Sequence, residues 1–134
     1  MIDKSNEVFH NVAYAVRAEH PAATVTGEYT RRPSKFPAVT VDETSNVMVD
    51  WLEDSSNEEK FAGLTYRVQI FSNQQNGKRA EARKIFITVD TEMRRMGFRR
   101  VAYSVMPEIY DSTIYSITAT YEAVVSAAGY VYKR

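Results

Sequence analysis

The sequence predicts an α+β domain, built as a mixed, mostly antiparallel sheet of about five strands with two helices packed on one face. Two observations predict this class. Apolar residues recur every three or four positions near the N-terminus and again from residue 78 to residue 96, and they alternate with polar residues in five other stretches. These patterns follow the order α-β-β-β-α-β-β, with turn residues between most of the strands. The 134 residues fit a single domain, 1–134.

Residues 3–18 form the first predicted helix, which Pro21 ends. Its apolar residues lie at helical spacing: Val8, Phe9, Val12, Ala13 and Val16. The stretch "ATVTGEY" alternates and predicts the first strand, with "TRRPSK" as its turn. The second strand is predicted at "FPAVTVDE" and the third at "LTYRVQI", residues 64–70.

A second helix of about five turns is predicted from Lys78 onward, after the turn "SNQQNG". Its apolar face consists of Ala82, Ile85, Phe86, Val89, Met93 and Met96. Asn76 or a neighbour is expected to cap its start, and Gly97 follows its last periodic residue, where a left-handed C-cap favours glycine. The stretch "RVAYSV" predicts the next strand, "PEIYDS" a turn, residues 114–125 a long strand and "YVYKR" a short closing strand.

The stretch "SNVMVDWLEDSSNEEKFAG", residues 45–63, has no clean period. A connection of this length inside a small domain is unusual and often functional. We expect the second strand to run on into a projecting β-hairpin or arm, whose apolar residues around Trp51 contact a partner. The alternative is that these side chains fold back as a flap on the domain's own core.

The charges are separated along the chain although the net charge is zero. Residues 42–60 hold seven acids and one base, and residues 78–100 hold eight bases and three acids. These can be two solvated faces, or the acidic arm of one copy can meet the basic face of the next, a head-to-tail contact that closes into a ring or grows into a filament. The candidate interface residues are Met48, Trp51, Leu52, Glu53, Asp54, Glu58, Glu59, Arg79, Arg83, Arg94, Arg95, Arg99 and Arg100.

No catalytic, cofactor or metal site is predicted, and we expect the chain not to be an enzyme. The absence of cysteine excludes disulfides, thiolate metal sites and cysteine nucleophiles. Gly77 and Lys78 resemble a phosphate-binding loop only superficially, because the loop has one glycine and the lysine precedes arginine instead of Ser or Thr. His10 and His20 are the only histidines, and no acidic pair lies at metal spacing from them.

The sequence favours neither sequence-specific binding of nucleic acid nor a membrane partner. The bases between residues 78 and 95 fall at the two ends of the predicted helix instead of in one stripe, which favours non-specific contact with DNA in transit over sequence-specific binding. Tyr103, Tyr115 and Tyr121 could stack on bases, but their alternation is explained more simply by core packing. Because the N-terminus is charged and no apolar run approaches the ~20 residues of a membrane span, we expect a soluble intracellular product without a membrane partner.

The order of elements and several stretches resemble the tail terminator (tail completion) proteins of long-tailed, siphovirus-like or myovirus-like, bacteriophages and prophages of Gram-positive bacteria. The resemblance covers about residues 20–134 and rests on "FPAVTVDE" with Asn46, "YRVQIFSNQQNGKRAEA", "VDTEMRRMGFRR", "YSVMPEIYDSTIYSITATYEAVV" and "VYKR". It implies a ring, usually of six subunits, that docks on the last ring of the tail tube, stops its polymerisation and offers a surface to the head–tail connector. It also implies a place at the head–tail junction of the virion, after assembly in the host cytoplasm, and a central channel for DNA.

Two other functions stay open. The chain can be a head-completion or connector protein, which is also structural and shares the small α+β plan. It can also be a small cytosolic ligand-binding protein or enzyme, for which a deep polar pocket in the sheet would be expected.

Overall fold

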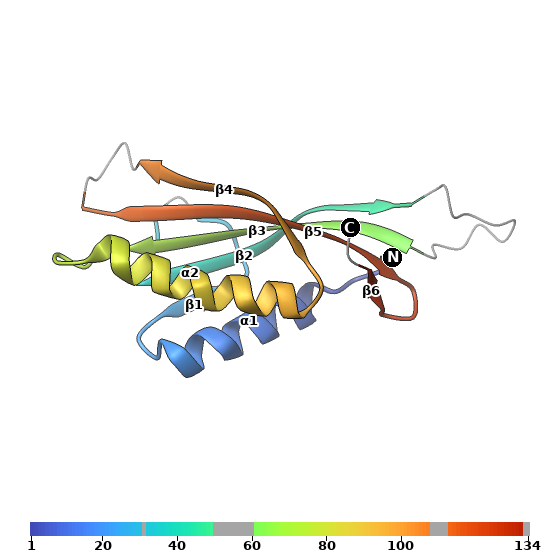
Figure 1. Cartoon of the computed structure of the whole chain (residues 1–134), viewed down its shortest axis with the longest axis horizontal. Helices are drawn as coiled ribbons and strands as arrows, with labels where there is room; N and C mark the ends of the chain where they lie inside the picture. Colours follow the sequence, from blue (N-terminus) through green and yellow to red (C-terminus); the bar gives the residue numbers. More distant parts are fainter. Residues whose placement is uncertain (31, 50–60, 108–112, 133–134) are drawn as a thin grey trace, which may run out of the picture.

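The computed structural model describes residues 1–30, 32–49, 61–107 and 113–132. Two layers form the molecule, with helices α1 and α2 on one face of a sheet (Figure 1). Within the described ranges the strands follow the order β1-β2-β3-β5-β4, and the short β6 pairs with β5. The elements are α1 (Ser5–Glu19), β1 (Thr24–Thr26), β2 (Ala38–Met48), β3 (Phe61–Ser72), α2 (Lys78–Arg95), β4 (Arg99–Pro107), β5 (Tyr115–Ser126) and β6 (Val131–Tyr132). The predicted α+β class, its mixed sheet and its element order are confirmed.

The link between the first two strands differs from the predicted turn. β1 runs parallel to β2, while the other neighbouring strands pair antiparallel. Parallel neighbours need a longer connection than a hairpin turn, and residues 27–37 supply it. In this connection the centre of the Tyr29 ring lies 4.3 Å from the Arg67 guanidinium carbon, and Phe36 packs against a small cluster that contains Phe71. Since Arg67 and Phe71 alternate with the residues that face the helices, the connection covers part of the opposite face of the sheet.

The second strand runs on into a hairpin with β3, as expected. β2 continues past residue 43 to Met48, and β3 begins at Phe61 instead of residue 64. Met48 pairs with Ala62, and the Val49 amide donates to the Phe61 carbonyl at 3.0 Å. The first and last residues of the predicted arm are therefore paired strand, and its central residues 50–60 lie outside the described part of the chain.

The main core fills the space between the sheet and both helices. The predicted apolar faces supply it: Val8, Val12 and Val16 from α1, and Ile85, Val89 and Met93 from α2. From the sheet, Tyr66 on β3 and Tyr121 on β5 sit directly opposite each other, and both are fully buried. The ring of Phe98, just after α2, meets Tyr66 edge-on with 5.3 Å between ring centres.

The two ends of α2 are set by glycines. Gly77, the neighbour of Asn76, is the N-cap residue, with φ of 99° and no side-chain hydrogen bond capping the helix, so the cap falls on a neighbour of Asn76. At the other end the Gly97 amide donates to the Arg94 carbonyl at 2.9 Å and the Phe98 amide to the Met93 carbonyl at 3.0 Å, with Gly97 at φ 95°. This is the Schellman arrangement, and it confirms the predicted C-cap.

Candidate interaction surface

Strand β4 exposes a row of apolar side chains at the edge of the sheet. It ends the strand order, and within the described ranges it pairs with β5 (Figure 1). The exposed fractions are 41% for Val101, 40% for Tyr103, 43% for Val105 and 48% for Met106. An edge strand of this length with apolar side chains is a contact site for another chain or an aggregation hazard, so natural proteins protect such edges.

Two features of the fold leave β4 exposed. Among the strands, helix α2 packs mainly against β3 and β5 and touches β4 less. The pairing of β4 with β5 also shifts register between Arg100 and Ala102, a bulge-like irregularity that places Val101 outside the regular ladder. The side of β4 that faces α2 is therefore only partly covered, by contacts such as Tyr103 on Phe86 with 5.0 Å between ring centres.

A groove of about 480 Å³ lies between α2 and β4. Its apolar part is formed by Phe86, Tyr103 and Ile87, and the Ile87 side chain is 61% exposed. Its polar part is formed by Arg83, Asp90, Thr91, Arg94 and Arg100. We call this set of residues the α2/β4 groove.

One acid anchors the middle of the α2/β4 groove. The Asp90 carboxylate accepts hydrogen bonds from Arg100 at 2.8 Å and from the Tyr121 hydroxyl at 2.7 Å. Burial raises the pKa of Tyr121, and the Asp90 carboxylate raises it further. The Arg100 guanidinium carbon lies 5.9 Å from the centre of the Phe86 ring, within reach of a cation–π contact. The side chains of Asp90 and Arg100 are thus held in place by their mutual hydrogen bond. Arg83 and Arg94 are exposed to solvent and form the rim of the groove.

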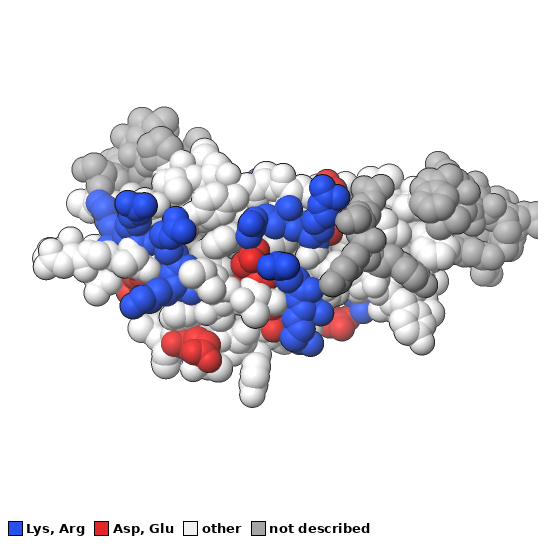
Figure 2. All heavy atoms as spheres, in the orientation of Figure 1, with Lys and Arg blue, Asp and Glu red and all other residues white. Residues whose placement is uncertain are grey.

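The predicted basic interface residues separate into groups. Figure 2 shows Lys and Arg side chains gathered over the two ends of α2, where the sequence places them. Arg83, Arg94 and Arg100 come together at the α2/β4 groove. Arg95 pairs instead with Glu92 on its own helix. Arg79 and Arg99 do not line the groove, although they lie on the same two elements.

The acidic side of the predicted interface is described only at its border. Met48, the last residue of β2, has an exposed side chain. The end of β2 and the start of α2 lie at opposite ends of the long axis (Figure 1). The other predicted residues of this side, Trp51, Leu52, Glu53, Asp54, Glu58 and Glu59, lie outside the described residues, so their role stays a prediction.

The three tyrosines considered for base stacking have different environments. Tyr121 is buried and Tyr115 packs against the core, as predicted. Tyr103 is the exception, because it belongs to the edge strand and is exposed. The signal for an edge was present in the sequence: two arginines begin the strand and Pro107 ends it, and both residue types are typical of edge strands.

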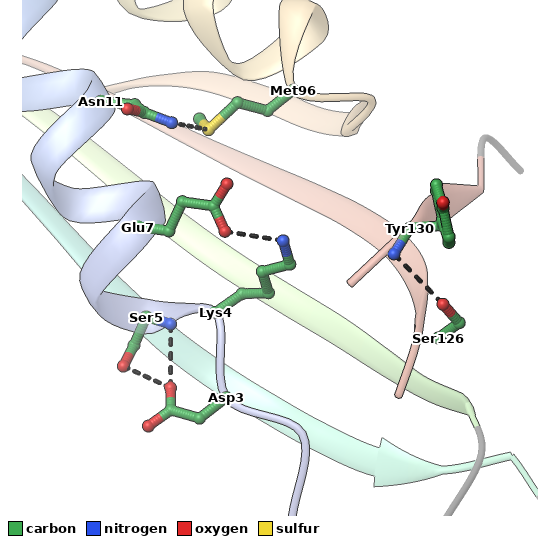
Figure 3. A network of polar contacts seen from close by, with 8 residues as sticks. All are labelled: Asp3, Lys4, Ser5, Glu7, Asn11, Met96, Ser126 and Tyr130. Atoms are coloured by element: carbon green, nitrogen blue, oxygen red, sulfur yellow. Dashed lines mark hydrogen bonds and ion pairs between the residues drawn. The ribbon is translucent and has the colours of Figure 1, made fainter. Parts of the chain in front are cut away.

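A second hollow, of about 600 Å³, lies between the first residues of the chain and the turn after β5 (Figure 3). Its charged groups bond to near neighbours. The Lys4 ammonium lies 2.6 Å from Glu7, and Asp3 accepts from the Ser5 amide at 2.9 Å and hydroxyl at 2.6 Å, which lowers the pKa of Asp3. Met1 lines the hollow and is almost fully exposed, so it is an open surface feature and not the deep pocket in the sheet that a ligand-binding protein would need.

The two histidines occupy structural positions. His20 is the C-cap residue of α1, and its Nε2 atom lies 2.9 Å from the Thr88 hydroxyl, which links the two helices. His10 is exposed and meets the Phe9 ring edge-on. In the described ranges, no three His, Cys, Asp or Glu side chains come together in a way that could hold a metal ion.

Neither a scan against protein-family models nor a search of curated proteins finds a match to this chain. The helices that the structure describes are too short or too polar to span a membrane. The fold, the β4 edge and the α2/β4 groove are therefore the features that bear on function.

Proposed function

We propose that this chain is a structural subunit of a phage tail, which caps the head-proximal end of the tail tube as a ring and forms the joint to the head connector. The proposal follows the resemblance to tail terminator proteins. The observation that carries it is the β4 edge, where Val101, Tyr103, Val105 and Met106 are all exposed along one strand.

The β4 edge supports assembly for a physical reason. An edge strand offers backbone N–H and C=O groups to an incoming strand, and its side chains add apolar area to the contact. Burying apolar surface contributes roughly 25 cal/mol per Å². A subunit that docks on copies of itself or on a tube end needs such a surface, whereas a monomer in solution gains nothing from keeping it exposed.

The charge distribution supports a head-to-tail contact. The α2/β4 groove carries three arginines and one acid, while residues 42–60 carry seven acids and one base. A heterologous contact between unlike surfaces closes into a ring when its rotation allows. The resemblance adds the subunit number of six, the tail tube protein and the connector as partners, and a channel through which DNA passes without sequence-specific contact.

The test is the mass of the protein by light scattering, alone and with isolated tail tubes or portals. We expect the protein to join tube ends as a ring and to stop tube growth, seen as capped tubes of uniform length by electron microscopy. Binding to portals but not to tubes would identify a head-completion or connector protein instead. A monomer that ignores both would remove the proposal.

A matched pair of variants ties this test to the β4 edge. Val101→Asp with Val105→Asp places two charges on the edge and should abolish capping. Tyr14→Asp with Tyr130→Asp places two charges at other exposed positions and should leave capping unchanged. Circular dichroism and a thermal melt check that all four substitutions leave the domain folded.

A further inference from the structure

We propose that the α2/β4 groove binds the acidic segment 50–60 of a second copy of this chain. The inference deepens the proposed function, because it names the partner of one surface of the subunit. It assigns the groove one kind of occupant, an acidic peptide with an aromatic anchor, and one source, a neighbouring subunit.

The groove has the chemistry of a peptide site. Ile87 is 61% exposed on α2, the Tyr103 ring of β4 packs against Phe86, and all three side chains line the groove. An aromatic or large aliphatic side chain seated here would cover all three. Aromatic anchors in such apolar hollows dominate the free energy of many protein interfaces.

The rim of the groove selects for acids. Arg83 and Arg94 lie about three helical turns apart on α2, so they flank the apolar part from both sides. Arg100 already bonds Asp90, which leaves the two rim arginines to meet an occupant's carboxylates. Arginine suits this role, because its planar guanidinium binds a carboxylate through two parallel hydrogen bonds.

Segment 50–60 has the complementary pattern. It contains five acids and one base, and its start reads "DWLED". Trp51 and Leu52 are thus flanked on both sides by carboxylates, as the groove's apolar residues are flanked by arginines. Electrostatic complementarity of this kind steers the encounter and fixes the register.

The ends of the segment show how far it reaches. Val49 and Phe61 are hydrogen-bonded to each other, so the segment leaves and returns at one point, the end of the β2–β3 hairpin. Eleven residues that go out and back extend at most about 18 Å from that point. The end of β2 lies at one extreme of the long axis, where a neighbouring copy in a head-to-tail assembly would dock (Figure 1).

The test is a titration of a synthetic peptide of residues 49–61 into the full-length chain carrying Trp51→Ala and Leu52→Ala. Trp51 is the only tryptophan of the sequence, so this host is free of tryptophan emission and its own segment lacks the anchor. We expect saturable binding, with a blue shift of the peptide's emission as Trp51 leaves water. Added salt should weaken the binding, since the rim charges are exposed.

Groove and control variants of the host locate the site. Arg83→Glu with Arg94→Glu should weaken peptide binding by about tenfold or more. Arg17→Glu with Arg79→Glu reverses the same number of exposed charges outside the groove and should change affinity little. Absence of saturable binding, or equal weakening by both pairs, would overturn the proposal.

A second measurement separates a neighbouring copy from the same chain. In the native protein, the Trp51 emission should shift to the blue as protein concentration rises, because the groove belongs to another molecule. A blue-shifted emission that is independent of protein concentration would mean that the segment binds the groove of the same molecule. That result would overturn the assignment to a second copy. Neither measurement uses tubes or portals. Tube capping can therefore fail while this contact is confirmed, and this contact can fail while tube capping is confirmed.

Discussion

Strands β4 and β5 are antiparallel neighbours with the same alternation of aromatic and aliphatic residues, yet they have different environments. Tyr121 on β5 is fully buried, whereas Tyr103 on β4 is 40% exposed. β5 has β3 on one side, β4 and β6 on the other, and α2 beneath it. The comparison shows that the burial of a strand's side chains depends on the strand's place in the sheet as well as on its pattern of apolar residues.

The polar contacts of the buried tyrosines differ from those of β4 in the same way. The Tyr121 and Tyr66 hydroxyls donate to Asp90 and Glu43, so each buried ring keeps a partner for its polar end. The exposed side chains of β4 instead meet solvent, and Tyr103 and Arg100 line the α2/β4 groove. The centre of the sheet therefore supplies stability, and its edge is available for binding.

The largest effect is expected from Tyr121→Ala. Removing a fully buried aromatic side chain typically costs about 3–5 kcal/mol, and here it also leaves Asp90 without its hydroxyl donor. Tyr103→Ala removes a half-exposed ring with one aromatic contact, worth about 1 kcal/mol. Urea denaturation of both variants measures the two free energies of unfolding. Equal losses of unfolding free energy in the two variants would mean that the edge strand β4 and the central strand β5 contribute alike to stability.

A smaller effect is expected from pH. Burial, with the nearby carboxylates Glu43 and Asp90, raises the pKa of Tyr66 and Tyr121 in the folded chain. Below about pH 10 both rings are neutral in the folded and unfolded states, and their contribution to stability is fully present. Above it the unfolded chain releases protons that the folded chain keeps, so the free energy of unfolding falls by about 1.4 kcal/mol per pH unit for each tyrosine.

The variant Tyr121→Phe isolates one of these two contributions. It keeps the buried ring but cannot ionise, so its stability should fall less steeply with pH than that of the native chain. Urea denaturation from about pH 8 to pH 11 gives both slopes. Identical slopes would show that Tyr121 ionises equally well in the folded chain.

The local elements of this fold were predictable, and the long-range pairings less so. The 3.6-residue period and Gly97 fixed both ends of α2, because helix signals are local. The parallel pairing of β1 with β2 was missed, since "TRRPSK" has the composition of a turn and nothing local specifies that the chain crosses the sheet. The cap at the start of α2 falls on Gly77, the neighbour of Asn76, whose left-handed conformation favours glycine.

The candidate surface was predicted in part. Charge counting along the chain drew attention to Arg83, Arg94 and Arg100, which do meet at one groove. The exposure of Ile87 and Val101 could not be predicted from the sequence, because an apolar residue is recognised as exposed only when the packing around it is known. Sequence spacing shows which residues share an element, whereas a groove is made by two elements that the fold brings together.

The smallest effect on stability is expected from Val101→Thr with Val105→Thr. Threonine keeps the branched β-carbon that favours strands and has nearly the shape of valine, so β4 should persist. Because both side chains are already exposed, the free energy of unfolding should change by no more than about 0.5 kcal/mol. Assembly on tube ends should nevertheless weaken, since the two hydroxyls replace apolar contact area. A loss of stability comparable to that of Tyr121→Ala would show that the β4 edge belongs to the core, and the contrast between the two strands would fail.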